Sequence, residues 1–185
     1  MRVISGTARG VQLKTPEGDL TRPTADRVKE AMFSILQFDL PGAAVLDLFG
    51  GTGQLGIEAL SRGAKSAVFV DQREEACRLI RENLRRTKLE SSARVHRADY
   101  GAFLKNTSDS FKIILLDPPY AEKFLENSLK IITEIDILQS GGIIVAEYPA
   151  EKTLEMAFSP QFAVKEYKYG NTKLAVFRKS TEGSC

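Results

Sequence analysis

The sequence predicts an α/β fold in which helices pack on both faces of a doubly wound sheet. Three observations lead to this prediction. From Ala43 onward, short apolar runs alternate with amphipathic helical segments. Several of these runs end in or next to an aspartate. The first run leads directly into a glycine-rich loop at residues 50–56, as expected where a strand turns into a helix at the binding edge of such a sheet.

Residues 1–40 precede this alternation and form an N-terminal extension. Residues 3–13 alternate loosely around a Gly-Thr-Ala-Arg-Gly segment, which predicts a small hairpin that carries Arg9 at its tip. A polar loop follows. A helix is then expected up to Leu36, with Thr24 as its N-cap. A Pro-Gly pair closes the extension.

Residues 41–180 form the main predicted domain, and residues 181–185 are expected to be a frayed tail. A hairpin joined near Gly170 would supply two antiparallel strands at the sheet edge. The predicted strands are 44–49, 66–70, 93–98, 111–116, 141–147 and two within 162–179, and the main helices are one ending at 63, 74–88 and 124–132.

Composition limits the class of protein. The 185 residues are 43% hydrophobic and 27% charged, as in an ordinary soluble domain with one core. The net charge of +2 permits a polyanionic partner without requiring one. No apolar run approaches the ~20 residues of a membrane span, so we expect a cytoplasmic protein. Two cysteines and one histidine argue against a disulfide framework or a metal site, and no metal is predicted.

An Asp-Pro-Pro-Tyr stretch at residues 117–120 follows the buried run 111–116. Proline lacks the amide hydrogen that a further strand bond would need, so the chain must leave the sheet here in a stiff turn. A carboxylate, a carbonyl between two prolines and an aromatic ring suit a flat base with an exocyclic amine, because the oxygens accept from the NH2 group and the ring stacks. The alternative is a strand terminator with a surface tyrosine.

Four predicted strands end in or next to an acid, and these acids are Asp47, Asp71, Asp99 and Asp117. The carboxyl ends of parallel strands meet at one rim of the sheet, where ligands of open α/β sheets bind. Each ionised carboxylate placed there is costly to desolvate unless a ligand or donor compensates it. The four acids therefore predict a shared site.

The glycine loop alone leaves two cofactors open. Residues 51–56 also satisfy the dinucleotide fingerprint, with Asp71 about 20 residues on as the ribose-binding acid. Charge favours S-adenosylmethionine over a nucleotide, because its sulfonium and ammonium suit four carboxylates that would repel a pyrophosphate. Asp71 would then bind the ribose hydroxyls and Asp99 the adenine amine, while Asp47 would hold the loop or face the ammonium. The full predicted cofactor set is Asp47, Phe49, Gly50, Gly51, Gly53, Asp71, Gln72, Asp99, Tyr100 and Thr24.

The chain resembles the bacterial small-subunit (16S) ribosomal RNA guanine-N2 methyltransferases, which are class I S-adenosylmethionine-dependent enzymes. The resemblance covers nearly the whole chain. It rests on the Arg-Pro-Thr segment at 22–24 with Asp-Arg-Val-Lys-Glu-Ala at 26–31, on Asp-Leu-Phe-Gly-Gly-Thr-Gly at 47–53, on Glu-Ala-Leu-Ser-Arg-Gly-Ala at 58–64, and on the Asp-Pro-Pro-Tyr turn. It implies a Rossmann-like seven-stranded sheet, an N-terminal hairpin that touches RNA, and an Arg-Pro-Thr segment that closes over the cofactor and target base. The hairpin tip is less basic here than in typical members.

The expected reaction is in-line attack of a guanine N2 on the sulfonium methyl, so that catalysis is mainly positioning and polarisation. The predicted catalytic residues are Asp117, Pro118, Pro119 and Tyr120. Candidate contacts to substrate RNA are Arg9, Arg22 and Arg27, with the basic helix face from Arg78 to Lys88 as a further candidate.

The expected partner is small-subunit ribosomal RNA or the assembled small subunit, and the expected state is a monomer. Two alternatives remain at this point. One is another exocyclic amine as substrate, in DNA adenine, other RNA or protein glutamine. The other is a non-catalytic RNA-binding assembly module.

Overall fold

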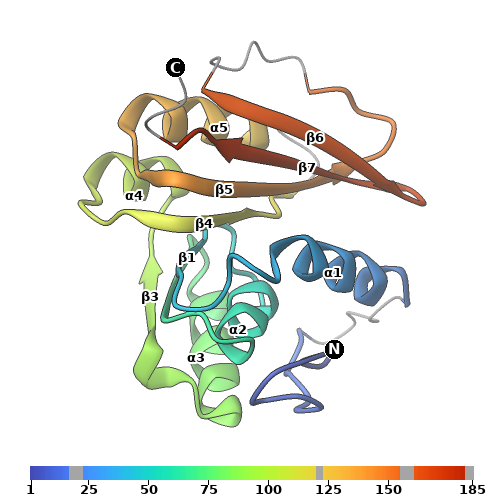
Figure 1. Ribbon diagram of the computed structural model, residues 1–185. Helices are drawn as coiled ribbons and strands as arrows, with labels where there is room; N and C mark the ends of the chain where they lie inside the picture. Colours follow the sequence, from blue (N-terminus) through green and yellow to red (C-terminus); the bar gives the residue numbers. More distant parts are fainter. Residues whose placement is uncertain (17–22, 120–122, 155–160, 182–185) are drawn as a thin grey trace.

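The computed structural model describes residues 1–16, 23–119, 123–154 and 161–181, with the side chains of 23–25 left aside. Its centre is a seven-stranded sheet in the order β3-β2-β1-β4-β5-β7-β6 (Figure 1). The strands are β1 (Ala44–Asp47), β2 (Ser66–Asp71), β3 (Ala93–Arg97), β4 (Phe111–Leu116), β5 (Leu138–Pro149), β6 (Phe162–Tyr169) and β7 (Thr172–Lys179). The helices are α1 (Pro23–Leu36), α2 (Gln54–Ser61), α3 (Glu74–Thr87), the short 3-10 helix η1 (Glu90–Ser92), α4 (Tyr100–Asn106) and α5 (Phe124–Ile135).

The sheet topology confirms the predicted doubly wound fold. Strands β1 to β5 run parallel, and β7 is inserted antiparallel between β5 and β6. The strand order reverses between β1 and β4, which lie side by side with Asp47 opposite Leu115. Successive connections diverge at this switch point, and a crevice therefore opens at the carboxyl ends of these two strands.

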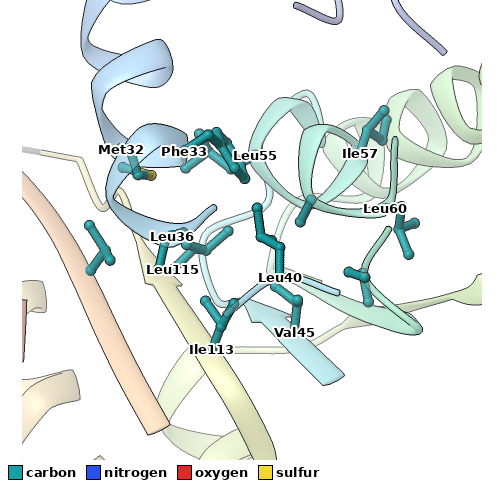
Figure 2. Packing of buried hydrophobic residues seen from close by; sticks show 14 of the residues in the cluster. Met32, Phe33, Leu36, Leu40, Val45, Leu55, Ile57, Leu60, Ile113 and Leu115 are labelled. Atoms are coloured by element: carbon teal, nitrogen blue, oxygen red, sulfur yellow. The ribbon is translucent and has the colours of Figure 1, made fainter. Parts of the chain in front are cut away.

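Two hydrophobic cores lie on opposite faces of the sheet, one under α1, α2 and α3 and the other under α4 and α5 (Figure 1). Figure 2 shows the first core, in which Met32 and Phe33 of α1 approach Leu55 of α2 above Val45 and Ile113 of the sheet. Met32, Phe33, Val45 and Ile113 have no exposed surface. Helix α1 thus contributes to the same core as the sheet, although it belongs to the N-terminal extension.

The first 13 residues pair as a minimal form of the predicted hairpin. An antiparallel bridge joins Arg2 to Gln12, the Val3 amide donates to the Val11 carbonyl at 3.1 Å, and the turn between them places Gly6 and Gly10 at positive φ. The backbone amides of Ile4 and Ser5 do not extend this pairing and donate to a side chain of α2. The pairing stays short because these amides find their acceptors on a helix about 54 residues further along the chain. Arg9 lies in the turn and is exposed, as predicted.

A buried group of charges, which we call the Glu58 cluster, holds this segment in place. The Glu58 carboxylate accepts from the amides of Ile4 and Ser5 at 2.8 and 2.9 Å and from Arg62 Nε at 2.8 Å. Lys29 Nζ lies 3.4 Å from the same carboxylate and donates to the Arg2 carbonyl at 2.7 Å. The Lys29 and Glu58 side chains are 2% and 0% exposed. The cluster joins α1, α2 and the N-terminus through satisfied polar contacts.

Several element boundaries differ from the prediction, and one helix was missed. Helix α1 begins at Pro23, so Thr24 lies within its first turn and is not the N-cap; proline is favoured at that first helical position. Strand β5 starts three residues earlier than expected, at Leu138. Helix α4 was not predicted, because seven residues give too short an apolar pattern to recognise. No helix in the described ranges is long and apolar enough to cross a membrane.

Candidate active site

A cavity of about 490 Å³ opens at the carboxyl ends of β1, β2 and β4, where the strand order reverses. Ten of the predicted site residues line it, namely Asp47, Phe49, Gly50, Gly51, Asp71, Gln72, Tyr100, Asp117, Pro118 and Pro119. Sequence reasoning missed further lining residues, among them Met1, Thr52, Gln54, Arg73 and Phe124. Three of the four rim aspartates therefore share one cavity.

Asp47 is the most buried of these acids, with only 1% of its surface exposed. Its Oδ2 accepts from the Gly56 amide at 3.0 Å, whereas its Oδ1 is buried without a hydrogen-bond partner in the described part of the chain. Burial raises the pKa of Asp47 to about 7, and the charges of Asp117 and Asp71 act in the same direction. A cationic ligand in the cavity would compensate this acid.

The glycine loop between β1 and α2 allows the backbone to turn tightly beside the cavity. Gly51 and Gly53 have φ values of 56° and 80°, which residues other than glycine rarely adopt. The Gly51 amide donates to Asp71 Oδ2 at 3.0 Å and so ties the loop to β2. Gly53 does not line the cavity; a Cβ there would lie 3.2 Å from Ile57. We therefore assign Gly53 a role in the backbone conformation of the loop.

Asp71 ends β2 and is held by four donors. Its Oδ1 accepts from the backbone N–H and Nε of Arg73, at 2.9 and 3.2 Å. Its Oδ2 accepts from the Gly51 amide and from Arg73 Nη2, at 3.0 and 3.1 Å. The Asp71–Arg73 ion pair raises the pKa of Arg73 further. The carboxylate is thus fixed in orientation at the cavity wall.

Three aromatic rings form one side of the cavity. Tyr100 lies 5.4 Å from Phe49 and 5.6 Å from Phe124, between ring centroids, and Phe49 lies 6.2 Å from Phe124. Phe49 and Tyr100 were predicted, whereas Phe124 was counted only as the first residue of a helix. Such a wall offers apolar and stacking contacts to a planar ring.

Asp99 does not reach the cavity lining. Its exposed side chain caps α4 by accepting from the Ala102 amide at 3.0 Å, and its neighbours Ala98 and Tyr100 line the cavity instead. The carboxylate remains at the rim, and its assignment to the adenine amine stays a prediction.

The Asp-Pro-Pro turn begins where β4 ends, at Leu116. Asp117 is half-buried, Pro118 is buried and Pro119 is exposed. Burial raises the pKa of the Asp117 carboxyl. The two prolines and Asp117 all line the cavity, so an acceptor on a rigid turn lies beside the proposed cofactor space.

Of the remaining predicted residues, those that the structure describes with side chains, Arg9 and Arg27, are not among the residues that line the cavity. Tyr120 and Arg22 fall outside the described residues, and Thr24 is placed only as part of α1. Arg9 and Arg27 are exposed, as are the basic positions of α3, Arg78, Arg81 and Arg85, with Lys88 at its end. Their contacts to RNA stay predictions.

Comparison with known proteins places the whole chain in one family. Residues 1–178 match the family described as "Conserved hypothetical protein 95". The chain is 40% identical over 184 residues to the "Putative rRNA methyltransferase YlbH" of Bacillus subtilis, covering 97% of this chain and 99% of that protein. It is 29% identical to the "Ribosomal RNA small subunit methyltransferase D" of Escherichia coli K12, over 99% of this chain and 92% of that one.

Solved structures agree with this placement. The "Putative methyltransferase yhhF from Escherichia coli" superposes with a TM-score of 0.86 at 28% identity, covering 98% of this chain and 99% of the other. The putative methylase HI0767 from Haemophilus influenzae gives a TM-score of 0.80 at 29% identity, over 97% and 98% of the two chains. The predicted cofactor, S-adenosylmethionine, is that of this family, and the partnerless buried oxygen of Asp47 fits a cationic ligand. The chain therefore belongs to the Conserved hypothetical protein 95 family, a class I S-adenosylmethionine-dependent methyltransferase family with homologues named small-subunit ribosomal RNA methyltransferase D.

Proposed function

We propose that this protein methylates the exocyclic N2 amine of a guanine in small-subunit ribosomal RNA. The observation that carries this proposal is the rigid Asp-Pro-Pro turn at the wall of the cavity, with the Asp117 carboxylate available as an acceptor. The relatives named as ribosomal RNA methyltransferases support the class of substrate. The choice of guanine N2 rests on the sequence resemblance and on the turn.

The cofactor supplies an electrophilic methyl group on a sulfonium when it is bound. We assign the ammonium end to the region of Asp47, whose buried Oδ1 has no partner in the described residues. We assign the ribose to Asp71 and the adenine to the wall formed by Phe49, Tyr100 and Phe124. Asp99 at the rim would accept from the adenine amine. These roles follow from charge and shape.

The target amine would donate to Asp117 and to the Pro118 carbonyl, which holds its nitrogen in line with the methyl group. The nitrogen lone pair is delocalised into the guanine ring, so the amine is a poor nucleophile that needs positioning and polarisation. Asp117 would favour the positive charge that develops on nitrogen as the C–N bond forms and the methyl–sulfur bond breaks. S-adenosylhomocysteine is the leaving group, and the methylated amine then returns to neutrality by losing a proton. Tyr120, outside the described residues, keeps its proposed role of stacking on the base.

RNA would approach the side of the molecule that carries the N-terminal extension. Arg9 and Arg27 are exposed there, and the extension, residues 1–40, is proposed to cover the cofactor and the target base. Contacts to phosphates by such arginines weaken steeply with salt. An interaction with ribosomal RNA that is insensitive to salt would contradict these assignments.

The decisive experiment maps the methylated nucleoside. The protein is incubated with labelled S-adenosylmethionine and undermethylated small ribosomal subunits, naked small-subunit RNA, duplex DNA or a protein extract, and each product is digested and analysed by mass spectrometry. N2-methylguanosine in the ribosomal RNA is expected. Label in DNA or protein would overturn the substrate, and no transfer to any of them would favour a non-catalytic RNA-binding module.

A further inference from the structure

The Asp71 carboxylate has no free acceptor position. A carboxylate offers about four lone-pair positions, two on each oxygen. Here the Arg73 backbone N–H and Nε occupy Oδ1, and the Gly51 amide and Arg73 Nη2 occupy Oδ2. A ligand hydroxyl can therefore donate to Asp71 only if one of these donors leaves.

The four donors differ in how easily they can leave. Two are backbone amides, and moving them would disrupt the glycine loop or the turn before α3. The other two belong to the Arg73 guanidinium, whose side chain is 66% exposed while that of Asp71 is 8% exposed. The guanidinium can rotate into solvent without disturbing the fold. Its departure frees one position on each Asp71 oxygen.

We propose that Arg73 is a competitor of the cofactor, and that its guanidinium occupies the two acceptor positions which the vicinal ribose hydroxyls take when the cofactor binds. This inference rests on the proposed role of Asp71 as the ribose acid. The geometry suits the exchange, because a guanidinium presents Nε and Nη2 as two donors side by side, and two vicinal hydroxyls present the same pattern. Arg73 also lines the cavity, as a displaced or competing group must.

The proposal predicts the direction in which shortening Arg73 changes cofactor affinity. If Arg73 must leave, shortening it removes an opposing interaction and strengthens cofactor binding. If Arg73 instead holds Asp71 ready for the ribose, shortening it weakens binding. Because the Arg73 guanidinium is largely exposed to solvent, its interaction with Asp71 is weakened by screening. Arg73→Ala should therefore lower the dissociation constant of S-adenosylhomocysteine by about two- to fivefold.

The test is isothermal titration of the ligand-free protein with S-adenosylhomocysteine, which needs no RNA and no turnover. The control is Arg97→Ala, because the Arg97 side chain is about as exposed as that of Arg73, pairs with Glu74, and does not line the cavity. The control should leave the dissociation constant unchanged. Raising the salt concentration should tighten binding to the unmodified protein relative to Arg73→Ala, since salt screens the ion pair that competes.

Two further titrations test whether the gain in affinity arises from the Asp71–Arg73 pair and the ribose hydroxyls. In the Asp71→Asn background, Arg73→Ala should no longer tighten binding, because the ion pair is already lost. With an analogue of the ligand that lacks both ribose hydroxyls, the gain from Arg73→Ala should also disappear. Weaker or unchanged binding of S-adenosylhomocysteine by Arg73→Ala would overturn the inference. If Asp71→Asn alone leaves the affinity unchanged, the assignment of Asp71 to the ribose fails, and that result is separate from methyl transfer to RNA.

Discussion

Two groups of buried charge in this molecule differ in how they are compensated. In the Glu58 cluster, the carboxylate has a lysine, an arginine and two backbone amides around it, all from the chain itself. Among the cavity acids, Asp47 has an oxygen without a hydrogen-bond partner in the described chain, and burial raises the pKa of Asp117. Glu58 lies on α2, and Asp47 accepts from the amide of Gly56 at the start of the same helix.

This difference in compensation distinguishes a buried charge that stabilises the fold from one that is expected to bind a ligand. A buried charge whose partners are all internal stabilises one arrangement of the chain, and removing a partner leaves the rest uncompensated. A buried charge that lacks partners costs stability in the free protein and is expected where a ligand supplies the missing interaction. On this reasoning α2 stabilises the fold through Glu58 and contributes to the ligand site through its N-terminal end.

The largest expected effect comes from breaking the Glu58 cluster. Glu58→Gln removes the negative charge and leaves Lys29 buried without its counter-ion, so the free energy of unfolding should fall by about 3–5 kcal/mol. Urea unfolding followed by circular dichroism measures this. The control is Glu74→Gln, in an exposed pair, which should change stability by less than about 1 kcal/mol.

A double variant keeps this prediction testable if Glu58→Gln is too unstable to purify. Adding Lys29→Met removes the uncompensated charge and should recover part of the loss, because replacing both members of a buried pair costs less than replacing one. A loss below about 1 kcal/mol in the single variant would contradict this prediction. It would mean that the Lys29 charge is not appreciably destabilised when it stays buried without its counter-ion.

The next effect concerns the turn after β4. Asp117→Ala should lower turnover about 100-fold or more, as expected for removing one preorganised electrostatic group, with little change in cofactor affinity. Single-turnover methylation of RNA and titration with S-adenosylhomocysteine measure the two quantities separately. Asp109→Ala, in the exposed pair with Arg94, is the control. Equal losses in turnover and affinity would make Asp117 a cofactor-binding residue.

A further effect is a pH dependence from Asp47. Its pKa of about 7 in the folded protein lies above the ordinary value of about 3.9, so the folded state binds the proton more tightly than the unfolded state. The stability of the ligand-free protein should therefore fall as pH rises from about 4 to 7. A cationic ligand favours the ionised carboxylate, so the affinity for S-adenosylmethionine should rise about tenfold between pH 6 and pH 8.

Calorimetric titration at the two pH values checks the change in affinity, and thermal unfolding across the range checks stability. Asp47→Asn has no ionisable group at this position and should lose most of both slopes. Asp117, whose pKa burial also raises, faces the same carboxylate and would account for any slope that remains. An unchanged pH dependence in Asp47→Asn would assign the titration to Asp117 instead of Asp47.

Features that depend on local sequence were predicted best. Strand β4 and the pair β6 and β7 agree with the predicted ranges 111–116 and 162–179, because apolar runs bounded by proline, glycine and polar residues are local signals. The rim of aspartates followed from parallel strands having one common edge, and three of the four acids share the cavity.

Features that appear only once the chain has folded were missed. The amides of Ile4 and Ser5 bond to Glu58 on a distant helix, which no local pattern reveals. Arg73 follows Asp71 by two residues, but only the folded turn brings its guanidinium back onto that carboxylate. Asp99 was placed in the cavity because its side chain was not recognised as the cap of the short helix α4.

The docking of the N-terminus on α2 also has a consequence during translation. Ile4 is made 54 residues before the carboxylate that receives its amide. At typical elongation rates of about 5–20 residues per second, this separation corresponds to roughly 3 to 10 seconds. During that interval the helix and strands that cover Met32 and Phe33 of α1 in the folded protein are still incomplete. The first residues synthesised therefore cannot make their native contacts until α2 has been translated.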